Sequence, residues 1–262
     1  MYDIQNQPSK SGITIDKVGV KNLSYPITVR DRAKKIQYTI GSINMYVNLP
    51  HQFRGTHMSR FIEILNEYHR EIHIDTVSKI LQKMKTKLNA QEAHMEIRFP
   101  YFIEKKAPIS GAVSMMKYDC TYIGNLKEKK DFILGVEIPV NSLCPCSKEI
   151  SEKSAHNQRS IITIQARFHK FVWIEELIEV AEQSASSPLY ALLKRKDEKY
   201  ITEYAYDHPM FVEDMVRTVA EKLNQDSRIE WYNVSSENFE SIHNHSAYAS
   251  LEYDKRKDKI SR

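Results

Sequence analysis

The hydrophobic pattern of the chain predicts strands and helices in a repeated order. Runs rich in β-branched and aromatic residues, with partial alternation of apolar and polar positions, indicate strands. Apolar residues spaced three and four positions apart indicate amphipathic helices. The predicted strands are residues 17–29, 34–49, 93–103, 111–124, 131–143, 159–170, 228–240 and 246–254, and the predicted helices are 57–69, 75–88, 172–185 and 209–224.

The order of these elements is β-β-α-α-β-β, and it occurs twice. Adjacent helices between pairs of strands favour an antiparallel sheet with helices on one face, an α+β fold rather than a βαβ fold. No Gly-, Ser- or Pro-rich linker separates the repeats, so we expect one continuous structure with a seam near residues 125–130. The expected parts are a flexible N-terminal tail at 1–12, a first half at 13–127, a second half at 128–255 and a basic C-terminal tail at 256–262.

Two connections in the second half break the symmetry of the repeat. Residues 142–158 form an unusually long joint between two strands, and residues 186–208 form a long loop between the two helices. Long connections in compact domains are often functional. These two segments are therefore where we look first for chemistry.

Composition and charge narrow the class of protein. Of the 262 residues, 41% are hydrophobic and 27% are charged, which is ordinary for a globular protein. No apolar window is long enough to span a membrane, and the N-terminus lacks the pattern of a signal peptide. We therefore expect a cytoplasmic protein with no membrane partner. The net charge of +4 is too small to indicate nucleic acid as a partner, but it suits a basic pocket for a polyanionic small molecule.

The cysteines point to a metal. The chain has only Cys120, Cys144 and Cys146, which is not a disulfide scaffold. Two of them lie in the polar stretch "NSLCPCSKEISEKSAHNQRS", where Cys144 and His156 are both suitable ligands for zinc or another transition metal. A structural zinc ribbon needs four ligands at CxxC-type spacing, which the chain lacks. Three ligands with one open position suit catalysis, although a buried thiol and a surface histidine are the simpler alternative for each residue alone.

The third ligand stays open on spacing alone. Asp197, Glu198 and Glu203 in the loop at 186–208 are carboxylate candidates, but each sits among Lys and Arg and is equally suited to a solvated, charge-balanced loop.

Two further groups carry possible chemistry. Glu240, His243 and His245 lie between two strands, and they either transfer protons or form an exposed polar turn. Glu213 lies on a predicted helix, where its simplest partner is Arg217 one turn later.

The stretch "LCPCSKEISEKSAHNQR" resembles the signature of the prokaryotic type IB GTP cyclohydrolases. Four further stretches carry the same resemblance along nearly the whole chain: "VGVKNLSYPI", "RGTHMSRFIE", "LKRKDEKYITEYAYDHPMFVEDMVR" and "ESIHNHSAYA". The resemblance implies a tandem (bimodular) tunnelling fold, whose β-β-α-α-β-β unit occurs twice per subunit. It further implies a homotetramer with active sites at subunit interfaces, and most of each site in the second half of the chain.

The resemblance also assigns roles to residues. It implies that one divalent ion per site, Mn²⁺, Zn²⁺ or Fe²⁺, is the only cofactor, with no organic one. Glu213 is implied to anchor guanine and Cys146 to transfer protons. The implied metal ligands are Cys144, His156 and Glu198, and the implied acid–base residues are Glu240, His243 and His245. By charge alone, the candidates for the triphosphate are Lys148, Arg159, Lys194 and Arg195.

The implied reaction is hydrolysis of GTP to 7,8-dihydroneopterin triphosphate and formate, the first step of the synthesis of folate and hence tetrahydrofolate. Three alternatives remain. An archaeal-type cyclohydrolase uses Fe²⁺ and gives a 2′,3′-cyclic phosphate. A nitrile reductase of the same fold uses a nucleophilic cysteine and a nicotinamide cofactor, and it leaves Cys144, His156 and Glu198 unexplained. A non-enzymatic, metal-containing module would bind nucleotides without turnover.

Overall fold

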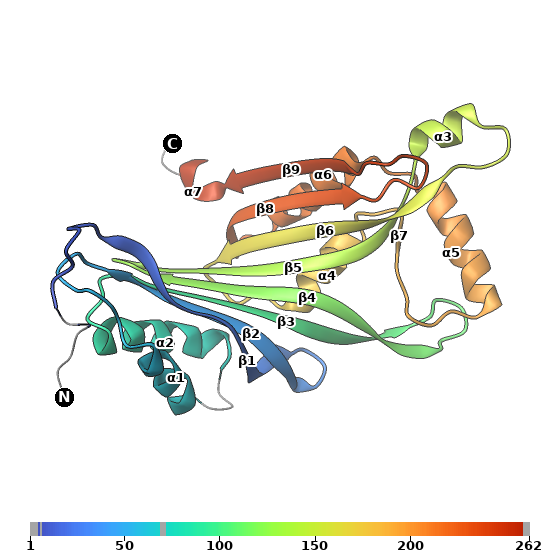
Figure 1. Ribbon diagram of the computed structural model, residues 1–262. Helices are drawn as coiled ribbons and strands as arrows, with labels where there is room; N and C mark the ends of the chain where they lie inside the picture. The colour runs from blue at the N-terminus through green and yellow to red at the C-terminus, as the bar shows by residue number, and fades with distance from the viewer. Residues whose placement is uncertain (1–4, 6, 69–71, 259–262) are drawn as a thin grey trace. The chain divides into compact units, whose positions relative to one another are not determined.

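The computed structural model describes residues 5, 7–68 and 72–258 (Figure 1). The predicted tails at 1–12 and 256–262 therefore lie partly outside the described residues. The strands are β1 (Ile15–Asp31), β2 (Lys35–Leu49), β3 (Ala93–Lys106), β4 (Val113–Leu126), β5 (Lys130–Leu143), β6 (Asn157–Phe168), β7 (Ser187–Pro188), β8 (Ile229–Asn238) and β9 (Ala247–Asp254). The helices are α1 (Met58–Glu67), α2 (Ile74–Lys87), α3 (Pro145–Ile150), α4 (Ile174–Glu182), α5 (Arg195–Asp207), α6 (Val212–Gln225) and α7 (Lys255–Asp258).

The strands follow the order β1-β2-β3-β4-β5-β6-β8-β9, and the short β7 pairs with β5. The pairs β1–β2, β2–β3, β6–β8, β8–β9 and β5–β7 are antiparallel. In the described part of the chain, no helix is long and apolar enough to cross a membrane. The structure thus confirms the repeated order of strands and helices, with additions in the second half.

Two compact units make up the described chain. The first comprises residues up to Pro100 together with Thr121–Leu134. In it, α1 and α2 lie on one face of the strands (Figure 1), and β3 alternates buried and more accessible positions from Ala93 to Phe99. Helix α2 packs closely on β4 at Gly124, where an added Cβ would lie 2.6 Å from Val77 Cγ1. The predicted boundary at 127/128 stays a prediction about the sequence repeat.

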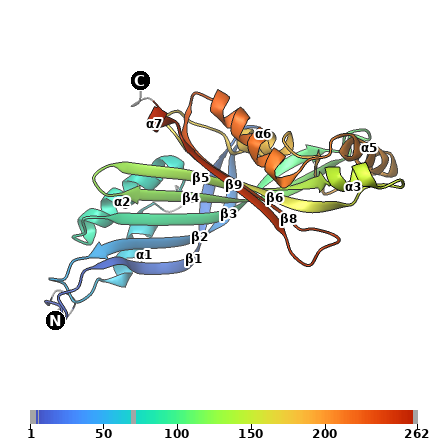
Figure 2. The same ribbon diagram turned by 90° about the horizontal axis from the view of Figure 1, so that it is seen from above.

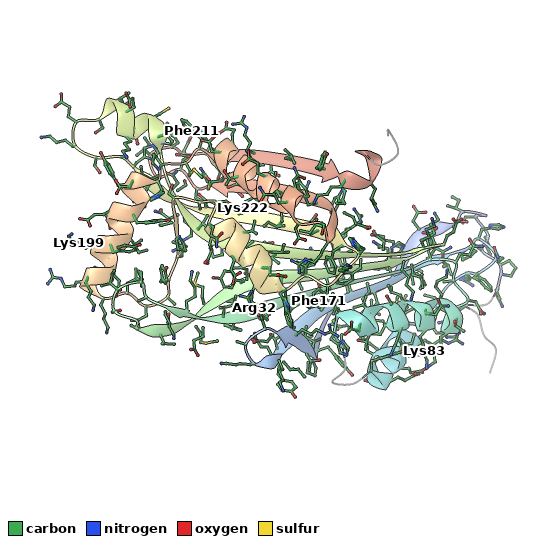
Figure 3. The ribbon with its side chains drawn as sticks, turned by 180° about the vertical axis from the view of Figure 1, so that it is seen from behind. Arg32, Lys83, Phe171, Lys199, Phe211 and Lys222 are labelled. Atoms are coloured by element: carbon green, nitrogen blue, oxygen red, sulfur yellow. The ribbon has the colours of Figure 1, made fainter. Side chains whose placement is uncertain are left out.

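The second unit comprises Tyr101–Cys120 and the chain from Gly135 onward. Helix α6 packs on β8 and β9, and Figure 3 views the helix-covered side, with Lys222 on α6. The register of β6 with β8 pairs Ser160 with Asn238 and Ile164 with Val234. Tyr232 Oη lies 2.9 Å from Asn224 Oδ1, near the end of α6, so the start of α6 lies toward the Asn238 end of β8.

Three helices of the second unit begin in the same way. A carboxylate at the third helical position reaches back and accepts a hydrogen bond from the backbone N–H just before the helix, which is half of a capping box. Glu176 does this for α4, Asp197 for α5 and Asp214 for α6, at 2.8, 2.8 and 3.2 Å. This local signal explains why the polar segment at 186–208, expected as a loop, contains the helix α5. The joint at 142–158 likewise contains the short helix α3.

Arg228 connects the start of α4 to the start of β8. Its guanidinium donates to both Glu176 oxygens at 3.0 and 3.2 Å, to both Asp226 oxygens and to the Phe171 carbonyl at 3.2 Å. Hydrogen bonding from Arg228 holds the pKa of Asp226 below its ordinary value, and the same two carboxylates raise the pKa of Arg228. A bidentate network of this kind contributes more to the free energy of unfolding than an isolated surface ion pair does.

We predict that Arg228→Met lowers the unfolding free energy by about 1–3 kcal/mol, because charged hydrogen bonds are lost. Lys199→Met, which breaks only the exposed pair with Glu203, should change it by less than about 0.5 kcal/mol. Folding lowers the pKa of Asp226. The contribution of the Asp226–Arg228 interaction to the free energy of unfolding is therefore fully present above the ordinary carboxyl pKa of about 3.9, and it is lost as the pH falls through the lowered value. Urea unfolding at pH 7 and pH 3 measures both effects, and an equal loss at both pH values would contradict the assignment.

Candidate active site

The end of β5 is fixed by both polar groups of the Leu143 backbone. Its N–H donates to Ser186 Oγ at 2.9 Å, and its carbonyl accepts from the Met210 N–H at 3.1 Å. The first bond fastens β5 to the segment after α4. The second brings the chain that enters α6, and with it Glu213, beside the residue that precedes Cys144.

Ser147 connects Cys144 and His156. The Cys144 N–H donates to the His156 carbonyl at 3.1 Å, which closes the segment between β5 and β6. The Ser147 N–H points to Cys144 Sγ at 3.4 Å, and its hydroxyl lies 3.2 Å from the Cys144 carbonyl. The same hydroxyl accepts from the His156 N–H at 3.1 Å. The two predicted ligands are therefore held together by backbone and serine hydrogen bonds.

The His156 ring faces two oxygen atoms. Nδ1 lies 2.9 Å from Gln158 Oε1 and 3.9 Å from Glu240 Oε2. The side chains of His156 and Glu240 are only 15% and 14% exposed, so these polar groups meet away from most solvent. The structure thus brings Cys144, His156 and Glu240 to the ends of β5, β6 and β8.

The remaining proton-transfer candidates are exposed. Cys146 lies in the first turn of α3 and is solvent-exposed. His243 and His245 lie in the connection from β8 to β9, which extends beyond the strand ends in Figure 2. Their rings stack with centroids 5.1 Å apart and planes inclined at 18°. The two imidazole rings therefore lie against each other at the surface.

Asp197 is a structural carboxylate. It is fully buried and accepts from the Ile109 and Ser110 N–H groups at 2.9 and 2.7 Å, from Ser110 Oγ at 2.6 Å and from the Lys194 N–H at 2.8 Å. Burial alone raises the pKa of Asp197, but the hydrogen bonds from Ser110, Lys194 and Ile109 outweigh it and hold that pKa well below the ordinary value. With four donors on one carboxylate, Asp197 has little capacity left for a metal.

Glu198 has the opposite surroundings. It is exposed in the first turn of α5, and its carbonyl accepts from Thr202 Oγ1 at 2.8 Å one turn later. Thr202 lines a cavity of about 370 Å³ between α5 and the segment that ends at His156. Its other lining residues are Leu143, Ser154, Ala155, Asn157, Glu203, Tyr206 and Asp207. Glu198 therefore lies on α5 one helical turn before Thr202, the first residue of that helix that lines the cavity.

The basic candidates lie on α3, on β6 and at the start of α5. Lys148 Nζ donates to the Tyr206 carbonyl and lies 4.2 Å from the Tyr206 ring centroid, which fastens α3 to α5. Arg159 lies at an exposed position of β6, and Lys194 and Arg195 lie at the exposed start of α5.

Glu213 is exposed in the first turn of α6, close to the start marked by Phe211 in Figure 3. The expected pair of Glu213 with Arg217 gives way to another: Arg217 Nη1 lies 3.5 Å from Asp214 Oδ1. Glu213 is thus available to a ligand.

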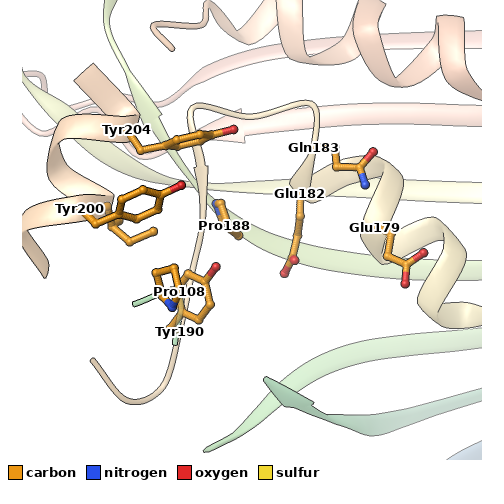
Figure 4. A pocket seen from close by; sticks show the side chains of 9 residues that line it. Pro108, Glu179, Glu182, Gln183, Pro188, Tyr190, Tyr200 and Tyr204 are labelled. Carbon is orange, nitrogen blue, oxygen red and sulfur yellow. The ribbon is translucent and has the colours of Figure 1, made fainter. Parts of the chain in front are cut away.

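A second cavity lies on the other side of α5. Its volume is about 280 Å³, and Tyr200 and Tyr204 face Glu182 across it (Figure 4). Glu182 accepts from Lys105 Nζ at 2.8 Å and from Tyr118 Oη at 2.7 Å. Because its carboxylate is already paired and no predicted site residue lines this cavity, we do not assign it to the reaction.

Among the described residues, no three His, Cys, Asp or Glu side chains lie close enough to hold a metal ion. Cys144 and His156 are brought together, but Glu198 does not join them. The assignment of these three residues as ligands therefore stays a prediction.

The sequence profile of the family described as "Type I GTP cyclohydrolase folE2" matches residues 1–249. The chain belongs to this family. GTP cyclohydrolase FolE2 of Geotalea uraniireducens is 59% identical over 256 residues, which cover 98% of this chain and 94% of that protein. The corresponding protein of Syntrophus aciditrophicus is 60% identical over 253 residues, or 96% of this chain and 99% of that protein. Membership confirms the enzyme class expected from the motifs, a type IB GTP cyclohydrolase of folate synthesis.

Solved structures confirm the tunnelling fold. The uricase of Arthrobacter globiformis superposes with a TM-score of 0.55 at 9% identity, over 91% of this chain and 93% of that one. The urate oxidase of Bacillus subtilis gives a TM-score of 0.52 at 8% identity, over 92% and 99%. At such low identity the likeness concerns the fold alone.

Sequence reasoning missed Gln158 and Ser147, which surround the two predicted ligands. Gln158 had a signal: it follows His156 by two positions at the start of a strand, where alternate side chains share a face. Ser147 had none, because its contacts depend on the path of the chain through α3.

We predict that Asp197→Asn lowers the melting temperature by roughly 5 °C, because amide replacement leaves N–H donors facing an NH₂ group. Glu198→Gln should leave the melting temperature within about 1 °C, since that side chain is exposed. Calorimetry of the two neighbouring variants measures the contrast. Equal shifts of the melting temperature in the two variants would contradict the assignment of Asp197 as structural and of Glu198 as available to a ligand.

We predict that the three thiols react in order of accessibility. Cys146 should alkylate first, Cys144 more slowly, and Cys120 only on unfolding, because Cys120 is buried and burial raises the pKa of its thiol. Mass spectrometry of a timed iodoacetamide reaction at pH 7.5 measures the order. Early labelling of Cys120 would contradict it.

Proposed function

We propose that the protein hydrolyses GTP to 7,8-dihydroneopterin triphosphate and formate with a divalent ion held by Cys144, His156 and Glu198. The observation that carries this proposal is the connection of Cys144 to His156 through Ser147, in a chain of the type I GTP cyclohydrolase family. The reaction consumes one water overall: two hydrolytic steps release C8 of guanine as formate, and one water leaves when the ring closes again.

The donor set suits a divalent transition ion. It combines a thiolate, an imidazole and a carboxylate, which favour zinc or iron, while a single thiolate among harder ligands also admits manganese. When bound there, the ion supplies Lewis acidity for hydrolytic attack near neutral pH. Glu198 is exposed one turn before Thr202, which lines the cavity beside the His156 segment, and this supports it over the buried Asp197 as the third ligand.

The other residues then have distinct tasks. Glu213 anchors guanine, because a carboxylate can accept from the ring N1–H and the exocyclic amine together. The exposed Cys146 donates a proton to the purine ring, and the stacked pair His243 and His245 exchanges protons with the opened intermediates. Glu240, whose carboxylate faces His156, is the third acid–base residue of the site.

We further propose a homotetramer with active sites between subunits. Glu213 and the histidine pair are exposed on the isolated chain, and Glu198 is not gathered with Cys144 and His156. A neighbouring subunit packed against these groups supplies the enclosure that the reaction requires. The few cysteines, without a disulfide framework, support a cytoplasmic location.

We predict that the metal-stripped protein is inactive toward GTP and that Mn²⁺, Zn²⁺ or Fe²⁺ restores formate release together with neopterin triphosphate. Cys146→Ala should lower kcat by roughly 10²–10⁴-fold with little change in KM, as expected for loss of a proton donor. Glu213→Gln should raise KM by roughly 10–100-fold. Coupled formate and fluorescence assays measure both constants.

The matched control is Glu221→Gln, which changes an exposed glutamate on the same helix as Glu213 and should leave both constants unchanged. Formate accompanied by a cyclic phosphate would replace the proposal with the archaeal-type reaction. Intact GTP with every metal would end the cyclohydrolase assignment of the site.

A further inference from the structure

The hydrogen bonds around His156 distinguish its two ring nitrogens. Nδ1 faces Gln158 Oε1 at 2.9 Å and Glu240 Oε2 at 3.9 Å. Both oxygens are acceptors, so a neutral imidazole is most stable with its hydrogen on Nδ1 and its lone pair on Nε2. The ring is therefore prepared to bind an electrophile through Nε2.

Gln158 is itself fixed by a buried partner. Its side chain is only 7% exposed, and Nε2 donates to the hydroxyl of the fully buried Ser142 at 2.7 Å. The reversed amide would place its NH₂ group against Nδ1 and would turn the Nδ1 lone pair toward the Glu240 carboxylate. Repulsion between that lone pair and the carboxylate opposes the reversed arrangement. Glu240 thus determines which groups donate and which accept in the series of side-chain hydrogen bonds from His156 through Gln158 to Ser142.

Ser160, the next polar residue on the same buried face of β6, takes part in no such series of hydrogen bonds among the described residues. Ser160 follows Gln158 by two positions, is fully buried, and its hydroxyl oxygen has no hydrogen-bond partner among the described residues. A polar side chain on this face of β6 is therefore not sufficient to reach the site. Gln158 differs from Ser160 because its buried side chain bonds to Ser142 at one end and to His156 at the other.

We propose that Gln158, anchored by Ser142, is a positioning residue that holds the His156 imidazole with Nε2 as the outward lone pair. The tautomer follows from the contacts above, whereas its use in metal binding rests on the proposed function. Groups that orient metal-binding histidines in this way typically change metal affinity by about 10–100-fold when they are removed.

The first test measures the tautomer in the metal-free protein, without turnover. Long-range ¹H–¹⁵N NMR of histidine-labelled protein, at a pH where the ring is neutral, distinguishes hydrogen on Nδ1 from hydrogen on Nε2. We expect the wild-type His156 to carry it on Nδ1 and Gln158→Leu to lower the Nδ1–H population measurably, because only the more distant Glu240 carboxylate, at 3.9 Å, then faces Nδ1. Gln158→Glu keeps an acceptor and should restore the wild-type tautomer. Ser160→Ala, the matched control on the same strand face, should leave it unchanged.

The second test measures affinity for the metal alone. Competition of Co²⁺ with a chelator, followed by the visible absorption of the bound ion, should give a roughly 10–100-fold weaker affinity for Gln158→Leu than for wild type or Ser160→Ala. If Gln158→Leu does not fold, Ser142→Ala provides the same comparison with the acceptor retained but unanchored, and a smaller loss is expected.

The outcomes separate this inference from the proposed function. If wild type binds no metal but Gln158→Leu still shifts the tautomer, the positioning stands and the metal assignment fails. If wild type binds metal and releases formate, but tautomer and affinity are the same in Gln158→Leu, the positioning is overturned and the proposed function stands.

Discussion

The backbone hydrogen bond from the Cys144 N–H to the His156 carbonyl fixes where chemistry can occur in this chain. The segment between β5 and β6 leaves the sheet after Leu143, forms α3 and returns at Asn157. Closing such a segment costs conformational entropy that local contacts must offset. Ser147 contributes three hydrogen bonds to that closure, and each one involves Cys144 or His156. The same contacts that fold the segment therefore place a thiol beside an imidazole.

The buried face of the second unit changes character toward this point. Along β6 the inward residues pass from Ile164 and Ile162 to Ser160 and Gln158, and the paired positions of β8 pass from Val234 to Ser236 and Asn238. The buried hydroxyls of Ser160 and Ser236 have no hydrogen-bond partner among the described residues, so this end of the face is packed less favourably than an apolar core. Such departures from optimal packing are expected at functional sites. They also leave the polar surroundings that Gln158 and Ser142 require.

The sequence predicted the features that depend on neighbouring residues. Helix α2 and strand β6 follow from local apolar periodicity, and the pairing of Cys144 with His156 follows from a short polar segment between two strands. Helix α5 was expected as a loop, because its regularity lies in Tyr200 and Tyr204 rather than in an aliphatic stripe. The contacts of Gln158 with Ser142 join residues 16 positions apart across two strands, so no local pattern predicts them.

Asp197 and Glu198 show the limit of sequence reasoning most directly. Both are carboxylates in "KRKDEKYITE", and nothing in that stretch distinguishes their chemistry. The distinction comes from Ser110, 87 positions earlier, whose N–H and hydroxyl both donate to Asp197 and supply two of its four hydrogen bonds. Asp197 is consumed in holding the start of α5, and that fixed start in turn leaves Glu198 in solvent. One carboxylate is therefore structural because a distant turn donates to it, and its neighbour remains available for a ligand.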